Sequence, residues 1–144
     1  MALNYLLDTN IILYHLGGRL KNPLPHGKFI ISFVSEIELL SFAELNEKEE
    51  EIIRAFITNT PIIGITEEIK ATTISLRKHR RMKTPDALIA ATAINFDCCL
   101  LTNDVHFKNI PGLRSKSLPI KENKSVSESA KSYKAETPKN KLKR

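Results

Sequence analysis

Short apolar runs alternate with helical stretches along the first hundred residues, and this alternation restricts the fold more than any other feature. Strands are predicted near residues 3–7, 29–32, 62–65 and 98–102. Helices are predicted over residues 9–16, 34–43, 47–57, 67–82 and 84–94. Apolar strands separated by helices form right-handed βαβ units, in which helices cover both faces of a parallel sheet. The pattern therefore predicts an α/β protein.

Two of these helices have clear start signals. Thr66 precedes Glu67 and Glu68, so a capping hydroxyl is followed by two acids in the first turn. Thr84-Pro85-Asp86 combines a candidate capping threonine with a proline at the first helical position and an acid. The apolar stretch after Asp86 predicts a buried helix.

The chain of 144 residues suits one domain, which we expect over residues 1–114, followed by a tail over residues 115–144. The tail has nine basic and three acidic residues, so it carries the whole formal charge of +6. Because it has few large apolar residues, we expect it to be disordered. We favour a solubilising role, and a basic arm that attracts phosphates or an acidic partner is the alternative.

No apolar run is long enough to cross a membrane, and the N-terminus lacks the pattern of a signal peptide. We therefore expect a cytoplasmic protein with no membrane association. Cys98 and Cys99 are neighbours on a predicted strand, where their side chains point to opposite faces. This arrangement favours two structural thiols over a disulfide or a zinc site.

Four acids fall where the predicted strands end or the next helices begin. Asp8 directly follows the first strand, and Asp104 follows the fourth. Glu38 lies about one turn into the helix after the second strand, and Asp86 lies in the first turn of the buried helix. Because ligands of open parallel sheets bind beyond the carboxyl ends of the strands, all four can face one crevice.

Each acid also has a purely structural interpretation. Asp8 could cap the next helix, and Ser35 with Glu38 could form a capping box. Asp86 could stabilise its helix dipole, and Asp104 could be a turn residue beside Asn103. Taken singly these readings are the more common ones, but they do not explain why four acids lie at the same end of a parallel sheet.

Four carboxylates in one crevice repel each other, and a divalent cation relieves that repulsion. Oxygen ligands without histidine or cysteine favour Mg²⁺ or Mn²⁺ over Zn²⁺. Such a site can activate water and stabilise charge on a phosphoryl group. Four polar neighbours of the acids are predicted to orient them or to hold water: Thr9, Asn10, Thr102 and Asn103.

A basic cluster precedes Asp86. It consists of Arg77, Lys78, Arg80, Arg81 and Lys83. It could be a solvated helix end that complements the helix dipole, or a rim that contacts phosphates beside the metal site, and both interpretations stay open. The four histidines are scattered and form no ligand or nucleophile constellation.

Four stretches together resemble the PIN-domain family, and in particular the VapC-type toxins of toxin–antitoxin pairs. They are Tyr5 to Asn10, Ile31 to Leu40, Thr84 to Ala93, and Leu100 to Phe107 followed by Ile110 to Leu113. Each motif is weak alone, but four in order over residues 3–114 are fairly specific. The chain departs from the family pattern at Ser41-Phe42, where many relatives carry a small residue.

The resemblance implies a three-layer α/β/α sandwich and a Mg²⁺- or Mn²⁺-dependent endoribonuclease. It implies that the catalytic and metal-holding acids are Asp8, Glu38, Asp86 and Asp104. Glu36 competes with Glu38 for the second position, and the helical spacing from Ser35 favours Glu38. The resemblance also implies RNA products with 5′-phosphate and 3′-hydroxyl ends, an antitoxin partner and often a homodimer.

Two other functions remain as alternatives. The first is a catalytically silent module that binds RNA or an antitoxin-like partner. The second is another Mg²⁺-dependent enzyme, such as a DNA nuclease or a phosphatase, although no nucleophile-and-base pair for a covalent phosphatase is present. The hydrolysis of RNA phosphodiester bonds is the leading hypothesis.

Overall fold

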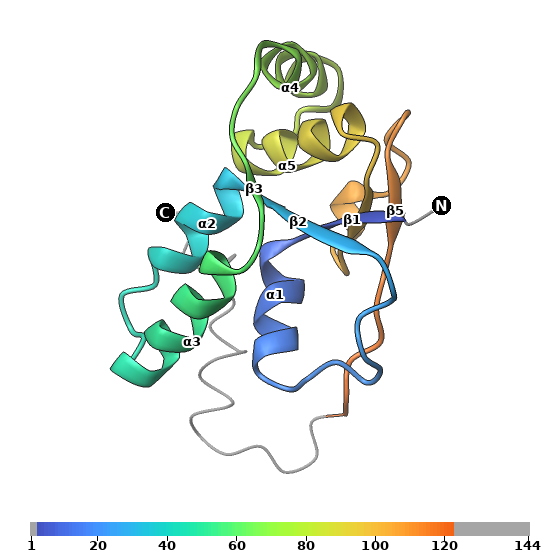
Figure 1. The fold of residues 1–144 in the computed structure, drawn as a ribbon. Coiled ribbons are helices and arrows are strands. Elements are labelled where there is room, and N and C mark those ends of the chain that lie inside the picture. Colours follow the sequence, from blue (N-terminus) through green and yellow to red (C-terminus); the bar gives the residue numbers. More distant parts are fainter. Residues whose placement is uncertain (1–2, 123–144) are drawn as a thin grey trace.

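A central parallel sheet of five strands organises the protein, whose computed structural model describes residues 3–122 (Figure 1). The strand order is β3-β2-β1-β4-β5, and all four neighbouring pairs are parallel. The strands are β1 (Asn4–Leu7), β2 (Lys28–Ser32), β3 (Ile62–Ile63), β4 (Cys99–Leu101) and β5 (Arg114–Lys116). The first four confirm the predicted strands, with β3 shorter than expected.

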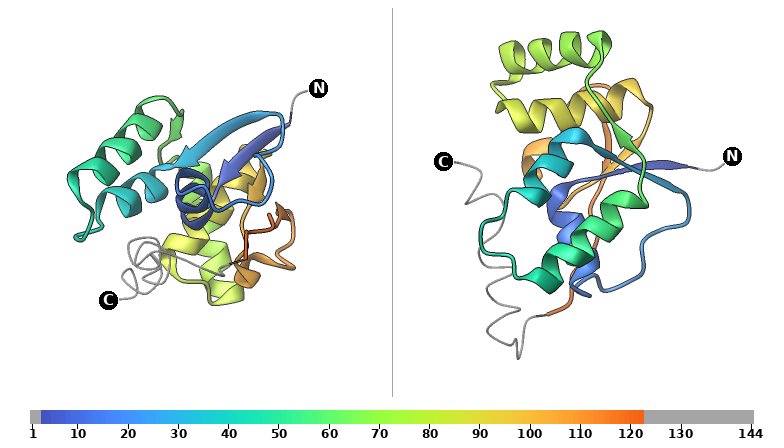
Figure 2. Two further views of the ribbon diagram at one scale, coloured as in Figure 1. Left: turned by 90° about the horizontal axis from the view of Figure 1, so that it is seen from below. Right: turned by 60° about the vertical axis from the view of Figure 1, so that its left-hand side comes forward.

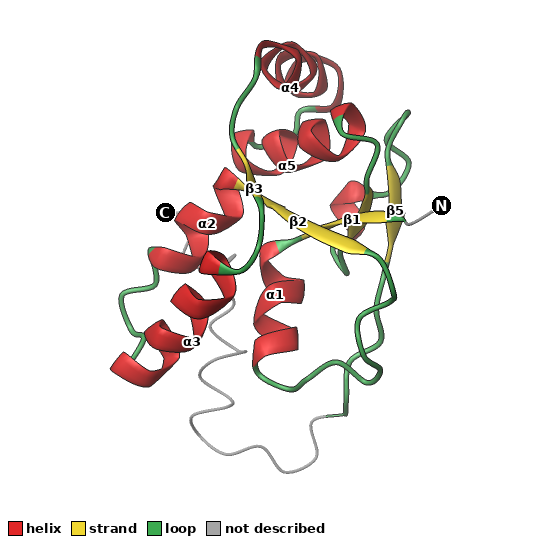
Figure 3. Cartoon of the chain, in the orientation of Figure 1, coloured by secondary structure: helices red, strands yellow, loops and turns green. Residues whose placement is uncertain are grey.

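The five predicted helices are also present (Figure 3). They are α1 (Thr9–Leu16), α2 (Phe33–Leu40), α3 (Glu47–Thr58), α4 (Glu67–Arg80) and α5 (Thr84–Asn95). A short 3₁₀ helix, η1 (Val105–Phe107), follows β4. Helix α2 ends three residues before the predicted end, where the Ser41 hydroxyl donates a hydrogen bond to the carbonyl of Ile37.

Alternation along the strands separates two apolar cores. Tyr5 and Leu7 of β1 pack in one core with buried residues of α1 and α3, whereas Leu6 packs in the other with residues of α4 and α5. The side chains of successive strand residues point to opposite faces, so each face of the sheet receives its own helical layer. Figure 2 shows α4 and α5 on one side of the sheet and α1 and α3 on the other. These layers confirm the α/β/α sandwich.

The strand order creates a switch point between β1 and β4. From β1 the chain moves outward to β2 and β3, and then returns to place β4 on the other side of β1. The backbone N–H of Asp8 donates to the carbonyl of Leu101 at 3.0 Å, which ties the ends of these two strands together. Connections that leave neighbouring strands in opposite directions open a crevice at the carboxyl edge of the sheet.

Strand β5 spans the position between residues 114 and 115 at which the sequence predicts the end of the domain and the start of the tail, and this division stays a prediction. Beyond β5, the backbone N–H of Lys21 donates to the Pro119 carbonyl at 2.9 Å, and Leu20 forms a β-bridge with Ile120. Backbone hydrogen bonds hold this segment, and the side chains of β5 are exposed, so no apolar run marks the strand in the sequence. The expected disorder of the tail beyond residue 122 lies outside the described residues.

The two helix starts differ in how well they were predicted. The Thr66 hydroxyl accepts the Ile69 N–H at 3.1 Å, so this cap is confirmed. Thr84 was expected to cap α5, but Lys83 occupies the cap position without a side-chain hydrogen bond, and Thr84 is the first helical residue. Proline, which is tolerated anywhere in the first turn, does not fix the start to a single residue. None of the helices in residues 3–122 is long and apolar enough to cross a membrane.

Candidate metal and catalytic site

Asp8 lies at the centre of the candidate site. It follows β1 and is 7% exposed. One carboxylate oxygen, Oδ1, accepts the backbone N–H of Thr9 at 2.9 Å, so Asp8 does cap α1. The other oxygen, Oδ2, accepts the Thr102 hydroxyl at 2.7 Å. The capping interpretation and the site interpretation are therefore compatible, because they use different oxygens of the same carboxylate.

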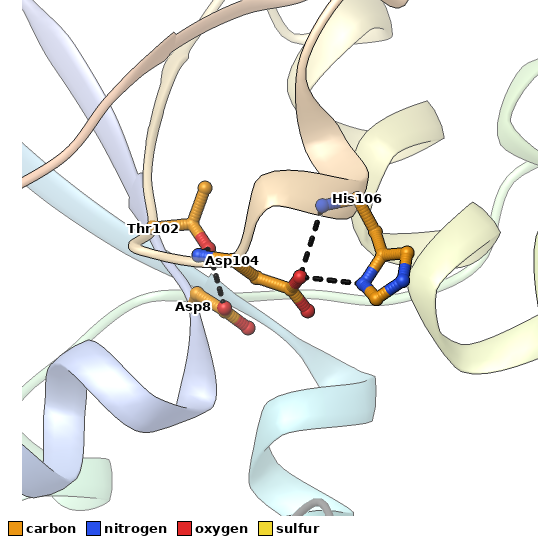
Figure 4. Close-up of polar contacts among 4 residues, drawn as sticks. All are labelled: Asp8, Thr102, Asp104 and His106. Carbon is orange, nitrogen blue, oxygen red and sulfur yellow. Dashed lines mark hydrogen bonds and ion pairs between the residues drawn. The ribbon is translucent and has the colours of Figure 1, made fainter.

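Thr102 joins Asp8 to Asp104 across the switch point. Its hydroxyl donates to Asp8 and accepts the backbone N–H of Asp104 at 3.0 Å, as Figure 4 shows. Thr102 follows β4, next to the end of β1, so the two strands that meet at the switch point each deliver one acid. This single buried hydroxyl fixes the backbone at Asp104 relative to the Asp8 carboxylate.

Asp104 has a 4% exposed side chain at the start of η1. Its Oδ1 accepts two hydrogen bonds from one residue, from the backbone N–H of His106 at 3.0 Å and from the ring Nδ1 of His106 at 2.7 Å (Figure 4). The predicted turn role is thus real, because Asp104 caps η1. The buried side chain also places a second carboxylate beside Asp8 (Figure 4).

Glu38 reaches the same crevice from α2. It is 9% exposed, and its carboxylate is hydrogen-bonded to the Thr9 hydroxyl, which also lies 2.9 Å from the Ser35 hydroxyl. Burial raises the pKa of Glu38 to about 7, although the Thr9 hydrogen bond lowers it, and the negative charges of Asp8 and Asp86 raise it further. Glu38 therefore experiences both neighbouring carboxylates.

The alternative in which Ser35 and Glu38 form a capping box does not hold. Helix α2 begins at Phe33, and Ser32 is its cap, since the Ser32 hydroxyl accepts the Val34 N–H at 3.0 Å. Ser35 consequently lies inside the helix, one turn before Glu38 on the same buried face. Glu36 is less buried than Glu38, which supports the choice of Glu38 as the second acid.

Asp86 is half-buried in the first turn of α5. Its charge acts on Glu38, but no hydrogen bond within residues 3–122 links Asp86 to the other acids. Thr9 thus links Asp8 to Glu38 through its backbone N–H and its hydroxyl, and the Thr102 hydroxyl links Asp8 to the backbone of Asp104. Asp86 acts on this group through its charge. In this arrangement α5 supplies its acid from the layer opposite to α1.

The polar neighbours of the acids divide into two groups. Thr9 and Thr102 contact the acids directly, as described above. The Asn103 amide instead donates to the Leu118 carbonyl at 2.8 Å and accepts the Leu118 N–H at 2.7 Å, so it holds the segment after β5. Asn10 is half-buried on the first turn of α1.

Sequence reasoning missed two residues at this site, Ser35 and His106. A signal for Ser35 existed, because a polar residue one turn before a buried glutamate lies on the same helix face. His106 stands two residues after Asp104, a spacing at which a turn brings side chain and carboxylate together. The spacing of the histidines did not single out His106, because its partner is a carboxylate and not a metal ion.

The residues of the basic cluster, Arg77 through Lys83, lie at the end of α4 and in the loop before α5. Arg77, Lys78, Arg80, Arg81 and Lys83 are all exposed. Arg77 donates through Nε to the Met82 carbonyl at 3.3 Å, and Arg81 ends the helix with a left-handed backbone (φ 55°). The cluster leads directly into the first turn of α5, which carries Asp86.

The chemistry of the acids fits a hard divalent cation. Within residues 3–122, no three acidic, histidine or cysteine side chains are already placed to hold an ion together. The acids are nevertheless oxygen donors, and the pKa of Glu38 is raised by burial and by the charges of Asp8 and Asp86. Bringing a cation among them removes this unfavourable charge, and oxygen-only donors select Mg²⁺ or Mn²⁺.

The fold and the site together define a class of protein: a small α/β domain with buried carboxylates at the switch point of its parallel sheet. The chain belongs to the PIN domain family, whose model matches residues 5–113. This match confirms the resemblance seen in the sequence.

Characterised relatives agree with this assignment. The chain is 29% identical over 126 residues to Ribonuclease VapC1 of Haemophilus influenzae, a match that covers 76% of this chain and 94% of the relative. A toxin–antitoxin complex from Klebsiella pneumoniae contains a chain with a TM-score of 0.63 and 30% identity, covering 76% of this chain and 94% of that one. VapBC2 from Rickettsia felis, bound to a promoter DNA fragment, has a TM-score of 0.67 at 24% identity, covering 81% of this chain and all of that one.

Proposed function

We propose that the protein is a metal-dependent endoribonuclease that hydrolyses RNA phosphodiester bonds, and that it is the toxin of a type II toxin–antitoxin pair. The observation that carries the proposal is the hydrogen-bonded connection of Asp8, Glu38 and Asp104 through Thr9 and Thr102 at the carboxyl edge of β1 and β4. Similarity to Ribonuclease VapC1 supports the nuclease assignment. Similarity to toxin–antitoxin complexes supports the toxin assignment.

PIN-domain ribonucleases depend on a divalent cation, and the carboxylates here would hold Mg²⁺ or Mn²⁺. Asp8, Asp86 and Asp104 would be the principal ligands, and Glu38 would complete the group. When bound, the cation would activate water and offset the charge that develops on the phosphoryl group. Thr9 and Thr102 would orient Glu38 and Asp8 through the hydrogen bonds already present.

The basic cluster would bind the RNA backbone beside the acids. Its side chains are exposed, and it directly precedes the helical turn that carries Asp86. An RNA strand whose phosphates bound there would therefore extend toward the acids. Phosphate contacts of this kind position a nucleic acid without reading its sequence. The cluster therefore supports RNA binding without predicting a cleavage sequence.

An antitoxin would be the protein partner. Several large apolar side chains of α2 and α3 are exposed, including Ile37 at 57% and Ile52 at 43%. Exposed apolar groups on neighbouring helices are typical of interaction surfaces. The homodimer and the cytoplasmic location stay predictions from the sequence and from the family resemblance.

A comparison of substrates tests the proposal. The full chain, free of any antitoxin, is incubated with single-stranded RNA, single-stranded DNA and a phosphomonoester, each with Mg²⁺ and with EDTA. We expect cleavage of RNA alone, abolished by EDTA, with 5′-phosphate ends on the products. Preferential cleavage of DNA or of the monoester would favour the other Mg²⁺ enzymes. RNA binding without cleavage in Mg²⁺ and in Mn²⁺ would favour the silent module.

A further inference from the structure

His106 makes an unusual pair of contacts with one oxygen of Asp104. Its backbone N–H and its ring Nδ1 both bond to Oδ1 of Asp104, at 3.0 Å and 2.7 Å (Figure 4). An ionised carboxylate oxygen can only accept hydrogen bonds, so the ring nitrogen that faces it carries the hydrogen. The remaining ring nitrogen, Nε2, does not take part in this contact.

The two contacts differ in what they can fix. The backbone N–H is held in place because Phe107, the next residue, is 1% exposed and packs in the core of α4 and α5. A single hydrogen bond to one oxygen still allows a carboxylate to turn about its last torsion, which has a broad energy minimum. A second donor that approaches the same oxygen from the ring restricts that rotation, and with it the direction of the other oxygen.

Stability alone is a weak reason for this arrangement. The His106 side chain is 75% exposed although Asp104 is buried, so water screens the pair from the histidine side and the ordering of the ring offsets part of its contribution to folding. Hydrogen-bond partners of metal-holding carboxylates have a larger effect, since their loss typically weakens metal binding by about 10- to 100-fold. The contact is thus better explained by what Asp104 does than by what η1 needs.

We infer that His106 is a positioning residue whose ring Nδ1–H holds the Asp104 carboxylate in the orientation that binds the divalent cation. The inference rests on the proposed metal site and adds to it a residue outside the four acids. It assigns no proton transfer to His106, whose ring acts through Asp104.

The test measures Mn²⁺ binding directly, by electron paramagnetic resonance of the free ion at pH 8, with the full chain and without RNA. Four variants are compared with the parent: His106→Leu, His106→Asn, His26→Leu and Asp8→Asn. The asparagine amide nitrogen can occupy the position of Nδ1, so His106→Asn keeps the donor while the leucine variant removes it. His26 is an exposed histidine in the loop between α1 and β2 and serves as the matched control.

We expect His106→Leu to weaken Mn²⁺ binding about tenfold, and His106→Asn and His26→Leu to stay within about twofold of the parent. Urea unfolding of the same variants checks that each is folded. Equal binding by His106→Leu and the parent would overturn the inference, as would equal weakening by the leucine and asparagine variants. If the parent itself bound no Mn²⁺, or if Asp8→Asn bound it as well as the parent, the proposed metal site would fail, and the inference with it.

Discussion

The raised pKa of Glu38 shows that gathering carboxylates at the site opposes folding when no cation is bound. Glu38 is buried between Thr9 and two other carboxylates, and its pKa is raised to about 7 from an ordinary value of 4.5. In the absence of a cation, the folded protein therefore binds a proton that the unfolded chain has already released between these two pH values. Ionised Glu38 opposes folding above pH 7, and this destabilisation disappears as the pH falls below 4.5.

Replacing Glu38 with Gln should make the metal-free protein more stable at pH 8, because a neutral amide removes the buried charge and can still accept the Thr9 hydrogen bond. The difference corresponds to at most about 3 kcal/mol and should vanish near pH 4.5, where both side chains are neutral. Urea unfolding in EDTA across this pH range measures it. A variant less stable than the parent at pH 8 would show that Glu38 is not held at a raised pKa.

Thr102 tests the connection between Asp8 and Asp104. In Thr102→Val the Asp8 carboxylate loses a donor in a buried position, and the Asp104 N–H loses its acceptor in a partly buried one. We expect a loss of about 1–3 kcal/mol in the free energy of unfolding. We also expect a fall in RNA cleavage that added Mg²⁺ partly restores, because the ligands are present but badly placed.

Thr73→Val is the matched control for this change. Thr73 is equally buried, on α4, and its hydroxyl donates only to the Ile69 carbonyl one turn earlier. We expect cleavage at the parental rate in this variant. The assignment of Thr102 would be wrong if both threonine variants affected cleavage to the same extent.

At the scale of elements, α4 and α5 combine a structural and a functional role. Their packed faces form one of the two cores, while the turn between them carries the basic cluster and leads into Asp86. A solvated helix end and an RNA-binding rim make the same contacts in the free protein. They differ in how strongly cleavage depends on salt, since each phosphate contact releases counterions from the nucleic acid.

Replacing Lys78, Arg80 and Lys83 together with Gln should raise KM for RNA with little change in kcat. The plot of log(kcat/KM) against log salt concentration should become shallower by about two, from roughly 0.7 per phosphate contact on a single strand. The same replacement at three exposed lysines elsewhere, Lys21, Lys28 and Lys48, is the control. Identical salt slopes for both triple variants would leave the solvated helix end as the correct interpretation.

For the whole molecule, the sequence predicts the architecture better than it predicts contacts. Four strands and five helices were predicted because hydrophobic alternation and helix start signals are local properties. Strand β5 could not be predicted in this way, since backbone pairing with β4 holds it at the edge of the sheet and its side chains are exposed. The prediction that Thr84 caps α5 was wrong, because a proline fits more than one position in the first turn and does not fix where the helix begins.

The candidate site follows the same division. The four acids were predicted from their places at strand and helix ends, and the structure links three of them through hydrogen bonds of Thr9 and Thr102. The contacts of His106 and Ser35 with this group depend on side-chain directions in a turn and a helix. Asn103 was predicted to orient the acids or to hold water, but it forms hydrogen bonds with the backbone of Leu118. Leu118 lies in the segment that the sequence predicts to be disordered, so this contact could not be predicted.

The most direct test of the central claim is the rate of RNA cleavage by Asp86→Asn compared with Asp97→Asn, in the same Mg²⁺ buffer. Asp86 contributes a charge to the crevice, whereas Asp97 is an exposed acid at the end of α5 that pairs with Arg114 at 3.0 Å. The account predicts that both variants fold like the parent, that Asp97→Asn cleaves RNA at the parental rate and that Asp86→Asn has lost activity. Cleavage by folded Asp86→Asn at the parental rate would contradict the account.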